Sequence, residues 1–320
     1  MARSLPEQVP PPEVEAAARE RSAARSARDW ATADRLRGEI EAAGWKVVDA
    51  GTAYRLEPAH PPDVEVEGEI RYGRSDAVPS RLHEPATGLA CVVVVASPDR
   101  ATTEAALAGL RAGARAGTDV VVVADGLPDE AVDGLAGAAG AGWPTELIRT
   151  SAPLGHAAAL NAGIRRARAE VVVVLDPSIV LTGDVVGPLV EALADATVAI
   201  AGPFGLRSSN LRQFEEALEG DAVAIQGYLQ AFRRSDYVAR GPLDEGFRFY
   251  RNLDIWWSLV LRDEGEGEPP RRAVVVPGLP LERGEPAAWM ATPEAVRDRL
   301  SKRNFYRILD RFRTRLDLAG

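Results

Sequence analysis

Two carboxylates follow apolar runs in the middle of the chain. Asp125 comes directly after the run 119–124, and Asp176 comes directly after the run 171–175. The second run is entirely apolar, which is typical of a strand buried on both faces of a parallel sheet. A side chain at the carboxyl end of such a strand lies where open α/β sheets bind their ligands. Carboxylate oxygens there can hold a hard cation.

An alternating series of strands and helices positions these carboxylates. Strands are predicted over 90–96, 119–124, 146–149 and 171–175, with helices over 102–116 and from Gly155 to Ile164. This β-α-β-α-β order predicts half of an α/β sheet. The remaining elements are less regular: helix 184–193, strands 197–201 and 226–233, helix 250–262, strand 272–276 and C-terminal helix 293–316.

The residues that lead to Asp176 resemble a known family. A helix of small residues contains Asn161 and Gly163, and the buried strand after it ends in Leu175-Asp176. This pattern is similar to the middle of a family 2 glycosyltransferase with the GT-A fold, and the resemblance covers roughly 89–265. It implies a Rossmann-like α/β fold with a mixed, mostly parallel sheet flanked by helices. It also implies transfer of a sugar from a nucleotide diphosphate-sugar to an acceptor hydroxyl, with inversion.

The resemblance further implies which residues bind the donor. In the family this strand ends in Asp-x-Asp, which holds a divalent metal (Mn or Mg) on the diphosphate. Asp176 matches the first aspartate and is the expected metal ligand, whereas Ser178 replaces the second. A basic residue such as Arg165 or Arg207 can compensate for the lost acid. The residues expected to bind the nucleotide are Asp125, Gly155, Asn161 and Asp176.

Local sequence offers other interpretations of the two aspartates. Asp125 precedes Gly126, and this combination is common in turns. The family has two consecutive aspartates here, and Ala124 replaces the first of them. Asp176 precedes a proline and can be a capping residue. His156, near a helix start, can contact phosphate or be a structural histidine. These alternatives stay open at the level of sequence.

Residues before the helix at 250–262 are the candidates for the catalytic base. An inverting transfer needs a base that takes the proton from the acceptor hydroxyl. The family presents acids there as Glu-Asp-x-Asp, and the matching run ends in Asn252-Leu253-Asp254. Asp254 is the expected base, and Asp244 and Glu245, in a stretch resembling the family's Phe-Asp-Glu, are the fallbacks. Asp254 can also be an acid favoured by the dipole at a helix start.

A second resemblance covers the start of the chain. Helices are predicted over 13–28 and 30–43, with Asp29 as N-cap, followed by a hairpin around Gly51. The run 25–37 with Gly44-Trp45 resembles the C-terminal helical module of cysteinyl-tRNA synthetases, which belongs to the part that engages tRNA. Lys and Arg do not outnumber Asp and Glu between 1 and 57, so the electrostatic term for tRNA is weak. A protein partner or a second copy docked through 13–58 is the favoured interpretation.

The expected organisation has four parts. They are a disordered tail over 1–12, the helical hairpin module over 13–58, a linker over 59–88 and a glycosyltransferase-like domain over 89–320. Within the linker, apolar residues fall on even positions at Val64, Val66, Ile70 and Tyr72, which predicts one half-buried strand.

Composition narrows the class of protein. The 320 residues carry a net charge of −9, which argues against wholesale nucleic-acid binding. The single cysteine, Cys91, excludes a disulfide within the chain. No apolar run reaches the roughly 18 to 20 residues that span a bilayer, and no signal-peptide core is visible. We expect a cytoplasmic protein, and the excess of Arg, Ala and Gly over Lys suggests a bacterial source.

Three functions follow from these observations. The first is sugar transfer from a nucleotide-sugar donor to an acceptor that the sequence does not identify. The second is a catalytically impaired scaffold or nucleotide-binding partner module, because Ala124, Ser178 and Asn252 stand where the family has acids. The third is a tRNA-linked regulator that acts through the N-terminal hairpin.

Overall fold

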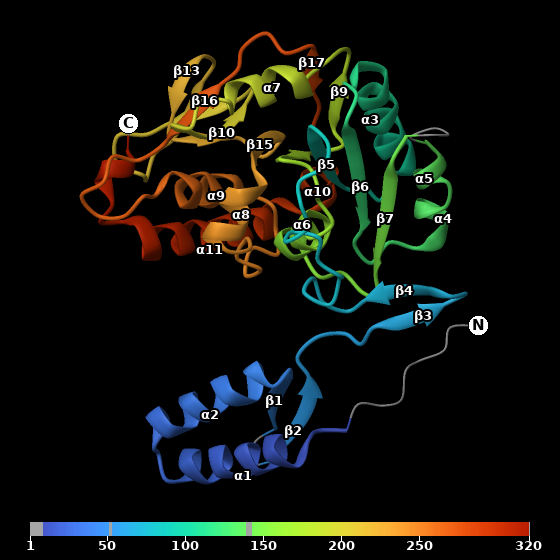
Figure 1. Cartoon of the computed structure of the whole chain (residues 1–320). Helices are drawn as coiled ribbons and strands as arrows, with labels where there is room; N and C mark the ends of the chain where they lie inside the picture. The colour runs from blue at the N-terminus through green and yellow to red at the C-terminus, as the bar shows by residue number, and fades with distance from the viewer. Residues whose placement is uncertain (1–8, 51–52, 139–142, 320) are drawn as a thin grey trace. The chain divides into compact units, whose positions relative to one another are not determined.

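The computed structural model describes residues 9–50, 53–138 and 143–319. The chain forms two compact units, Met1–Arg74 and Ser75–Gly320 (Figure 1). Gly51 and residues 1–8 of the expected tail lie outside the described residues. None of the described helices combines the length and apolarity that crossing a bilayer requires.

The first unit is a helical hairpin followed by a β-hairpin. Its elements are α1 (Pro12–Ser26), α2 (Trp30–Ala42) and the antiparallel strands β1 (Trp45–Ala50) and β2 (Ala53–Pro58). Asp29 caps α2 by accepting the Thr32 N–H at 3.1 Å, as expected. Val14, Ala18, Ile40 and Trp45 form a small core of this unit. On α2, Ala33, Leu36 and Ile40 are buried, whereas Trp30 is 57% exposed.

The linker contains two strands where one was predicted. β3 (Val64–Val66) and β4 (Glu69–Tyr72) pair antiparallel. Glu67 and Gly68 both have positive φ, 53° and 85°, and such a pair of residues makes a tight hairpin turn. The alternation of apolar residues therefore continues through the turn between the two strands. The alternation alone does not show that the chain reverses there.

The second unit is built on a mixed sheet, and this confirms the expected fold class. Its strands follow the order β13-β16-β10-β15-β8-β5-β6-β7 (Figure 1). The bounds are β5 (Ala90–Val95), β6 (Thr118–Ala124), β7 (Thr145–Thr150), β8 (Val171–Leu175), β10 (Val198–Gly202), β13 (Gly220–Ala222), β15 (Leu229–Arg233) and β16 (Arg272–Val275). Neighbours β7, β6, β5 and β8 are parallel, whereas β15 runs antiparallel to β8 and β10.

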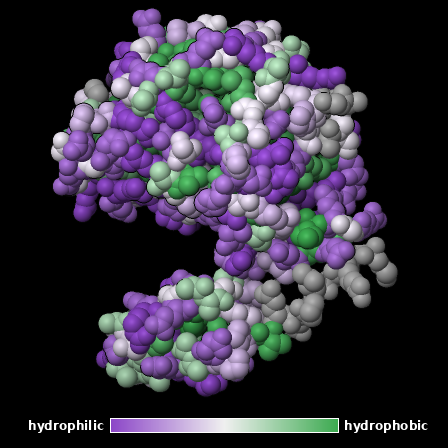
Figure 2. Space-filling model, in the orientation of Figure 1, coloured by the Kyte–Doolittle hydropathy of each residue, from purple (hydrophilic) through white to green (hydrophobic). Residues whose placement is uncertain are grey.

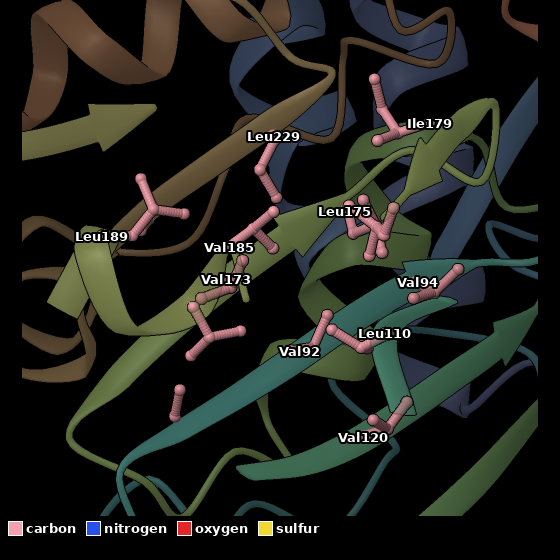
Figure 3. Packing of buried hydrophobic residues seen from close by; sticks show 14 of the residues in the cluster. Val92, Val94, Leu110, Val120, Val173, Leu175, Ile179, Val185, Leu189 and Leu229 are labelled. Carbon is pink, nitrogen blue, oxygen red and sulfur yellow. The ribbon is translucent and has the colours of Figure 1, made fainter. Parts of the chain in front are cut away.

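Successive side chains of the central strands point to opposite faces of the sheet, and helices cover both faces. On one face Val92, Val120 and Val173 pack with Leu110 of α3 (Arg100–Gly113) and Leu189 of α7 (Val186–Ala192), as Figure 3 shows. On the other face lies α6 (His156–Ile164). A Cβ on Gly163 would come 2.8 Å from a methyl carbon of Val123, so only glycine allows this close approach.

The remaining helices surround the irregular half of the unit. α9 (Leu253–Arg262) packs on β10 and contacts α11 (Glu294–Phe312). The other elements are α4 (Asp129–Val132), α5 (Leu135–Ala138), β9 (Ile179–Leu181), β11 (Gly205–Arg207), β12 (Glu215–Ala217), β14 (Ala224–Ile225), α8 (Arg234–Arg240), β17 (Leu281–Arg283), α10 (Ala287–Ala291) and a 3-10 turn (Leu316–Leu318). Polar and charged residues cover most of the face in Figure 2.

Candidate functional site

A cavity of about 450 Å³ opens beside the carboxyl end of β8. Its lining comes from α6, β8, the turn 226–228, the residues 250–254 that lead into α9, and the end of β17. A smaller hollow of about 100 Å³ shares His156 and Asp176 with it and extends to 95–98 at the end of β5. The volume of the larger cavity falls in the range of small-molecule sites.

Asp176 lies in the lining of both hollows, at the tip of β8. Its backbone N–H donates to the Tyr228 carbonyl at 2.9 Å, and its Oδ1 accepts the Ser178 N–H at 2.8 Å. The side chain is half-buried, which leaves the second carboxylate oxygen available to the cavity. Sequence reasoning therefore placed this residue at the correct end of the correct strand.

Asp254 lies in the same cavity, in the first turn of α9. Its Oδ2 accepts the Gly227 N–H at 3.0 Å and its Oδ1 accepts the Ile255 N–H at 2.9 Å. Burial raises the pKa of the Asp254 carboxyl, and the two backbone hydrogen bonds oppose that rise. A half-buried carboxylate with a raised pKa is suited to accept a proton from a bound hydroxyl.

Asn252, where the family has its usual base, sits just before α9. It adopts a left-handed conformation with φ of 69°, which asparagine tolerates better than most residues. Its Nδ2 donates to the Ser301 carbonyl at 2.9 Å, so the amide ties the helix start to α11. Asn252 lines the cavity but carries no group able to take a proton there.

His156 begins α6 and faces both hollows. Burial lowers the pKa of its imidazole to about 4, and the nearby Asp176 carboxylate opposes that fall only in part. The ring is therefore neutral at pH 7. It meets the Tyr250 ring edge-on, with 6.0 Å between centroids. A neutral imidazole can donate or accept one hydrogen bond in the cavity but supplies no positive charge.

The backbone N–H groups at the start of α6 are hydrogen-bonded to other groups of the protein. His156 donates its backbone N–H to the Arg248 carbonyl at 2.9 Å, and Asp125 accepts the N–H groups of Leu154 and Gly155 at 2.7 and 3.0 Å. Gly155 has φ of 103°, and a Cβ there would lie 2.9 Å from Cα of Arg248. Asp125 and Gly155 thus shape the entry to the helix and lie outside the lining of both hollows.

Asn161, the other predicted nucleotide ligand, is a buried link between α6 and the segment after α8. Its Nδ2 donates to the Leu243 carbonyl at 2.9 Å and to Glu245 at 3.0 Å. Its Oδ1 accepts the Tyr237 hydroxyl at 2.9 Å and the Leu243 N–H at 3.0 Å. These contacts use the full hydrogen-bonding capacity of the amide, and the residue is 1% exposed.

The two fallback bases and the two compensating arginines also lie outside the cavity. Asp244 pairs with Arg307 at 3.3 Å, and Glu245 accepts the Ser75 hydroxyl as well as Asn161. Arg165 donates to the Val78 carbonyl and Arg207 to the Glu219 carbonyl, at 2.8 and 2.9 Å. The cations that do line the cavity are Arg251 and Arg283. Sequence reasoning missed Arg283 because it comes from a short strand with no local pattern.

The described side chains do not fit a divalent ion held by the protein. Within residues 9–50, 53–138 and 143–319, no three His, Cys, Asp or Glu side chains are grouped as metal ligands. The hydroxyl of Ser178, in the place of the family's second aspartate, is buried without a hydrogen-bond partner among the described atoms and does not line either hollow. An ion at this site would have Asp176 as its one carboxylate ligand. Hard cations of this kind require several oxygen ligands.

Comparison with known proteins agrees with the fold and with the resemblance of the second unit. The family model described as Glycosyl transferase family 2 matches residues 91–250, half of the chain. The structure is similar to a mannosyltransferase of Pyrobaculum calidifontis, solved with GDP-Man and Mn²⁺, with a TM-score of 0.53 and 20% identity over 75% of this chain and 71% of that one. It is also similar to GalNAc-T7, solved with UDP, GalNAc and Mn²⁺. That TM-score is 0.57, with 14% identity over 72% of this chain and 50% of that chain.

The N-terminal unit has a relative of its own. A cysteine–tRNA ligase of Opitutus terrae is 52% identical over 58 residues, which are the N-terminal 58 residues of this chain. The match spans 18% of this chain and 13% of that ligase. The predicted resemblance of this segment is confirmed.

Proposed function

Because the chain belongs to glycosyl transferase family 2, we propose that it transfers a sugar from a nucleotide diphosphate-sugar to an acceptor hydroxyl, with inversion. One observation carries the proposal. Asp176 and Asp254, on separate elements, line the same cavity at the carboxyl end of β8. Open α/β sheets bind their ligands at this end of the strands.

The donor nucleotide occupies the hollow between the ends of β5 and β8. That hollow is lined by the backbone segment 95–98 and by Asp176 and His156. The free oxygen of Asp176 accepts hydrogen bonds from hydroxyls of the donor, and the neutral His156 imidazole offers one further hydrogen bond. Asp125 acts indirectly, since it fixes the loop from which His156 enters the site.

The acceptor enters on the Asp254 side of the larger cavity. Asp254 takes the proton of the acceptor hydroxyl while that oxygen forms a bond to the anomeric carbon. The bond between the anomeric carbon and the diphosphate oxygen breaks, and its electron pair leaves with the nucleoside diphosphate. Attack from the face opposite the leaving group inverts the anomeric centre. Asp244 and Glu245 take no part, because each is held in contacts outside the cavity.

Thermal unfolding in the presence of donors tests the proposal. UDP-, GDP- and dTDP-sugars are titrated, with EDTA or with Mn²⁺, against the full chain and its Asp176→Ala variant. A ligand at about 100 times its dissociation constant stabilises by about 2.7 kcal/mol, and we expect one nucleotide class to reach this value. Asp176→Ala reduces the shift, whereas Asp298→Ala, an exposed residue of α11, leaves it unchanged.

An assay of nucleoside diphosphate release, run beside the titration, separates catalysis from a scaffold role. A chain that binds a nucleotide-sugar but never releases the nucleoside diphosphate is the impaired module that Ser178 and Asn252 suggest. No shift with any nucleotide in either buffer contradicts the proposed donor site.

A further inference from the structure

We propose that Arg283 and Arg251 bind and neutralise the diphosphate of the donor, in place of a divalent cation held by two aspartates. The proposal rests on the proposed function, since it concerns the donor of that same site. An ion at this site would have Asp176 as its one carboxylate ligand, and this is the first observation behind the proposal. Asp176 already accepts the Ser178 N–H on one oxygen, and the Ser178 hydroxyl is buried and does not line the cavity.

Arg283 lies beside the position that lost its acid. β17 pairs antiparallel with β9, with Arg283 opposite Ile179. The Gly284 N–H donates to the Ser178 carbonyl at 3.1 Å. The backbone of Arg283 is therefore fixed next to the residue that stands in the family's second aspartate position, and its side chain enters the cavity from there.

Aromatic rings hold the Arg283 guanidinium in place. Its carbon lies 5.1 Å from the Phe204 ring centroid and 5.2 Å from that of Tyr228. The two rings meet edge to face, with centroids 5.9 Å apart. A guanidinium that stacks on aromatic faces keeps the N–H groups at its edge free to donate. Little conformational entropy is then lost when it binds two phosphate oxygens.

Arg283 has a partner that an anion can displace. Its Nη1 contacts Glu216 at 3.0 Å, and the Glu216 side chain is 56% exposed. Exposed ion pairs of this kind contribute little to stability. A diphosphate, with more charge and more acceptor oxygens than a carboxylate, competes well for the same N–H groups.

Arg251 is the second cation of the cavity. Its carbonyl accepts Nδ2 of Asn304 at 2.8 Å, which fixes the backbone just before α9. Its guanidinium lies over the Trp289 ring at 5.2 Å from the centroid. Within the described part of the chain its side chain makes no ion pair with a carboxylate, so its charge is available.

Both arginines line the same cavity as Tyr228. Burial raises the pKa of the Tyr228 hydroxyl, and the charges of Arg283 and Arg251 oppose that rise. The carboxylates of Asp176 and Glu285 act on it in the opposite direction. Arg283, Arg251 and Asp176 all line the same cavity, and the diphosphate of the donor is placed there. The chain as a whole is acidic, with a net charge of −9, so two arginines in one cavity are a local concentration of positive charge.

Calorimetric titration with UDP and GDP tests the inference. The full chain and its variants are titrated in EDTA and, separately, in Mn²⁺. We expect the wild type to bind one nucleotide in EDTA. Arg283→Ala and Arg251→Ala each weaken that binding by about 10- to 100-fold, the range for a charge-assisted hydrogen bond. Glu216→Gln tightens it by about 3-fold or more, because the competing carboxylate is removed.

The controls separate charge loss from unfolding. Arg299→Ala removes an exposed arginine of α11 outside the cavity and leaves the affinity unchanged. Arg283→Lys keeps the charge but not the planar fork, so it recovers part of the affinity. Thermal unfolding of each variant without ligand shows whether it is folded.

Two outcomes overturn the inference. Binding that requires Mn²⁺ and is insensitive to both arginine variants excludes the arginine site but leaves the proposed function intact. Absence of UDP and GDP binding in both buffers, with a folded protein, removes the proposed function together with the inference.

Discussion

Gly227 donates its backbone N–H to Oδ2 of Asp254 at 3.0 Å. The next residue, Tyr228, accepts the N–H of Asp176 through its carbonyl at 2.9 Å. One turn of the chain, 226–228, therefore fixes both carboxylates of the cavity. A Cβ on Gly227 would lie 3.3 Å from Cβ of Asp254, a tight contact that would require the Asp254 side chain to shift slightly.

The raised pKa of Asp254 predicts the acid side of the pH profile. A base works only when ionised, so transfer falls as pH drops through the pKa of this carboxyl. Because burial raises that pKa from its ordinary value of 3.8, the fall begins at a higher pH than for an exposed aspartate. The measurement is kcat/KM against pH. A rate that stays level down to about pH 5 and falls to half only near pH 4 would show an unperturbed carboxylate.

Gly155→Ala is expected to destabilise the second unit. The residue has φ of 103° and ψ of 163°, a region that is nearly restricted to glycine and costs other residues about 1 to 3 kcal/mol. Its Cβ would also lie 2.9 Å from Cα of Arg248. Urea unfolding measures the loss.

Gly38→Ala is the matched control for that variant. Gly38 lies within α2, and no atom would come within 4 Å of its Cβ. Alanine there should leave stability unchanged or raise it by about 0.5 to 1 kcal/mol. Equal effects at the two glycines would show that the backbone at Gly155 is not strained.

Asn161→Ala distinguishes a structural link from a nucleotide ligand. Loss of the amide leaves the Tyr237 hydroxyl and the Leu243 backbone groups buried without their partner. We expect a loss of about 2 to 5 kcal/mol in the free energy of unfolding. Gln213→Ala, at an exposed position, is the control. Unchanged stability with lost nucleotide binding would restore the role predicted from sequence.

His156 should remain neutral across the physiological range. Its pKa of about 4 follows from burial, which disfavours the cation more than Asp176 favours it. NMR titration of the imidazole, assigned with His156→Gln, should show a midpoint well below the ordinary histidine pKa of 6.5. A midpoint near 6.5 would mean that water reaches the ring freely.

The sequence predicts the strands and the helix around the site better than it predicts the side chains that line it. Valine-rich runs and a helix of small residues have strong periodic signals, so β5, β6, β8 and α6 are found within a few residues of their predicted bounds. These signals also place Asp176 at a strand end. Which way a carboxylate turns depends on partners elsewhere, and Asp125 turns to the amides of Leu154 and Gly155.

The rest of the site depends on pairing between strands far apart in the sequence, which sequence reasoning does not predict. Arg283 reaches the cavity because β17 pairs with β9, a contact between segments about 100 residues apart in a chain of 320. No local period marks either strand. The roles predicted for residues 13–58, a protein partner or tRNA, and the domain boundaries at 58 and 88 stay predictions.

Turnover by Asp254→Asn and Asp244→Asn tests the central claim most directly. Release of nucleoside diphosphate from the nucleotide-sugar that binds is measured for both variants and the wild type, with water as the acceptor of the sugar. Loss of the general base should lower the rate of Asp254→Asn by about 10²- to 10⁴-fold, with binding of the nucleotide-sugar retained. Asp244→Asn should keep most of the activity, because Asp244 lies outside the cavity and pairs with Arg307. Wild-type turnover in Asp254→Asn, or its loss in a folded Asp244→Asn, would contradict the assignment of the base.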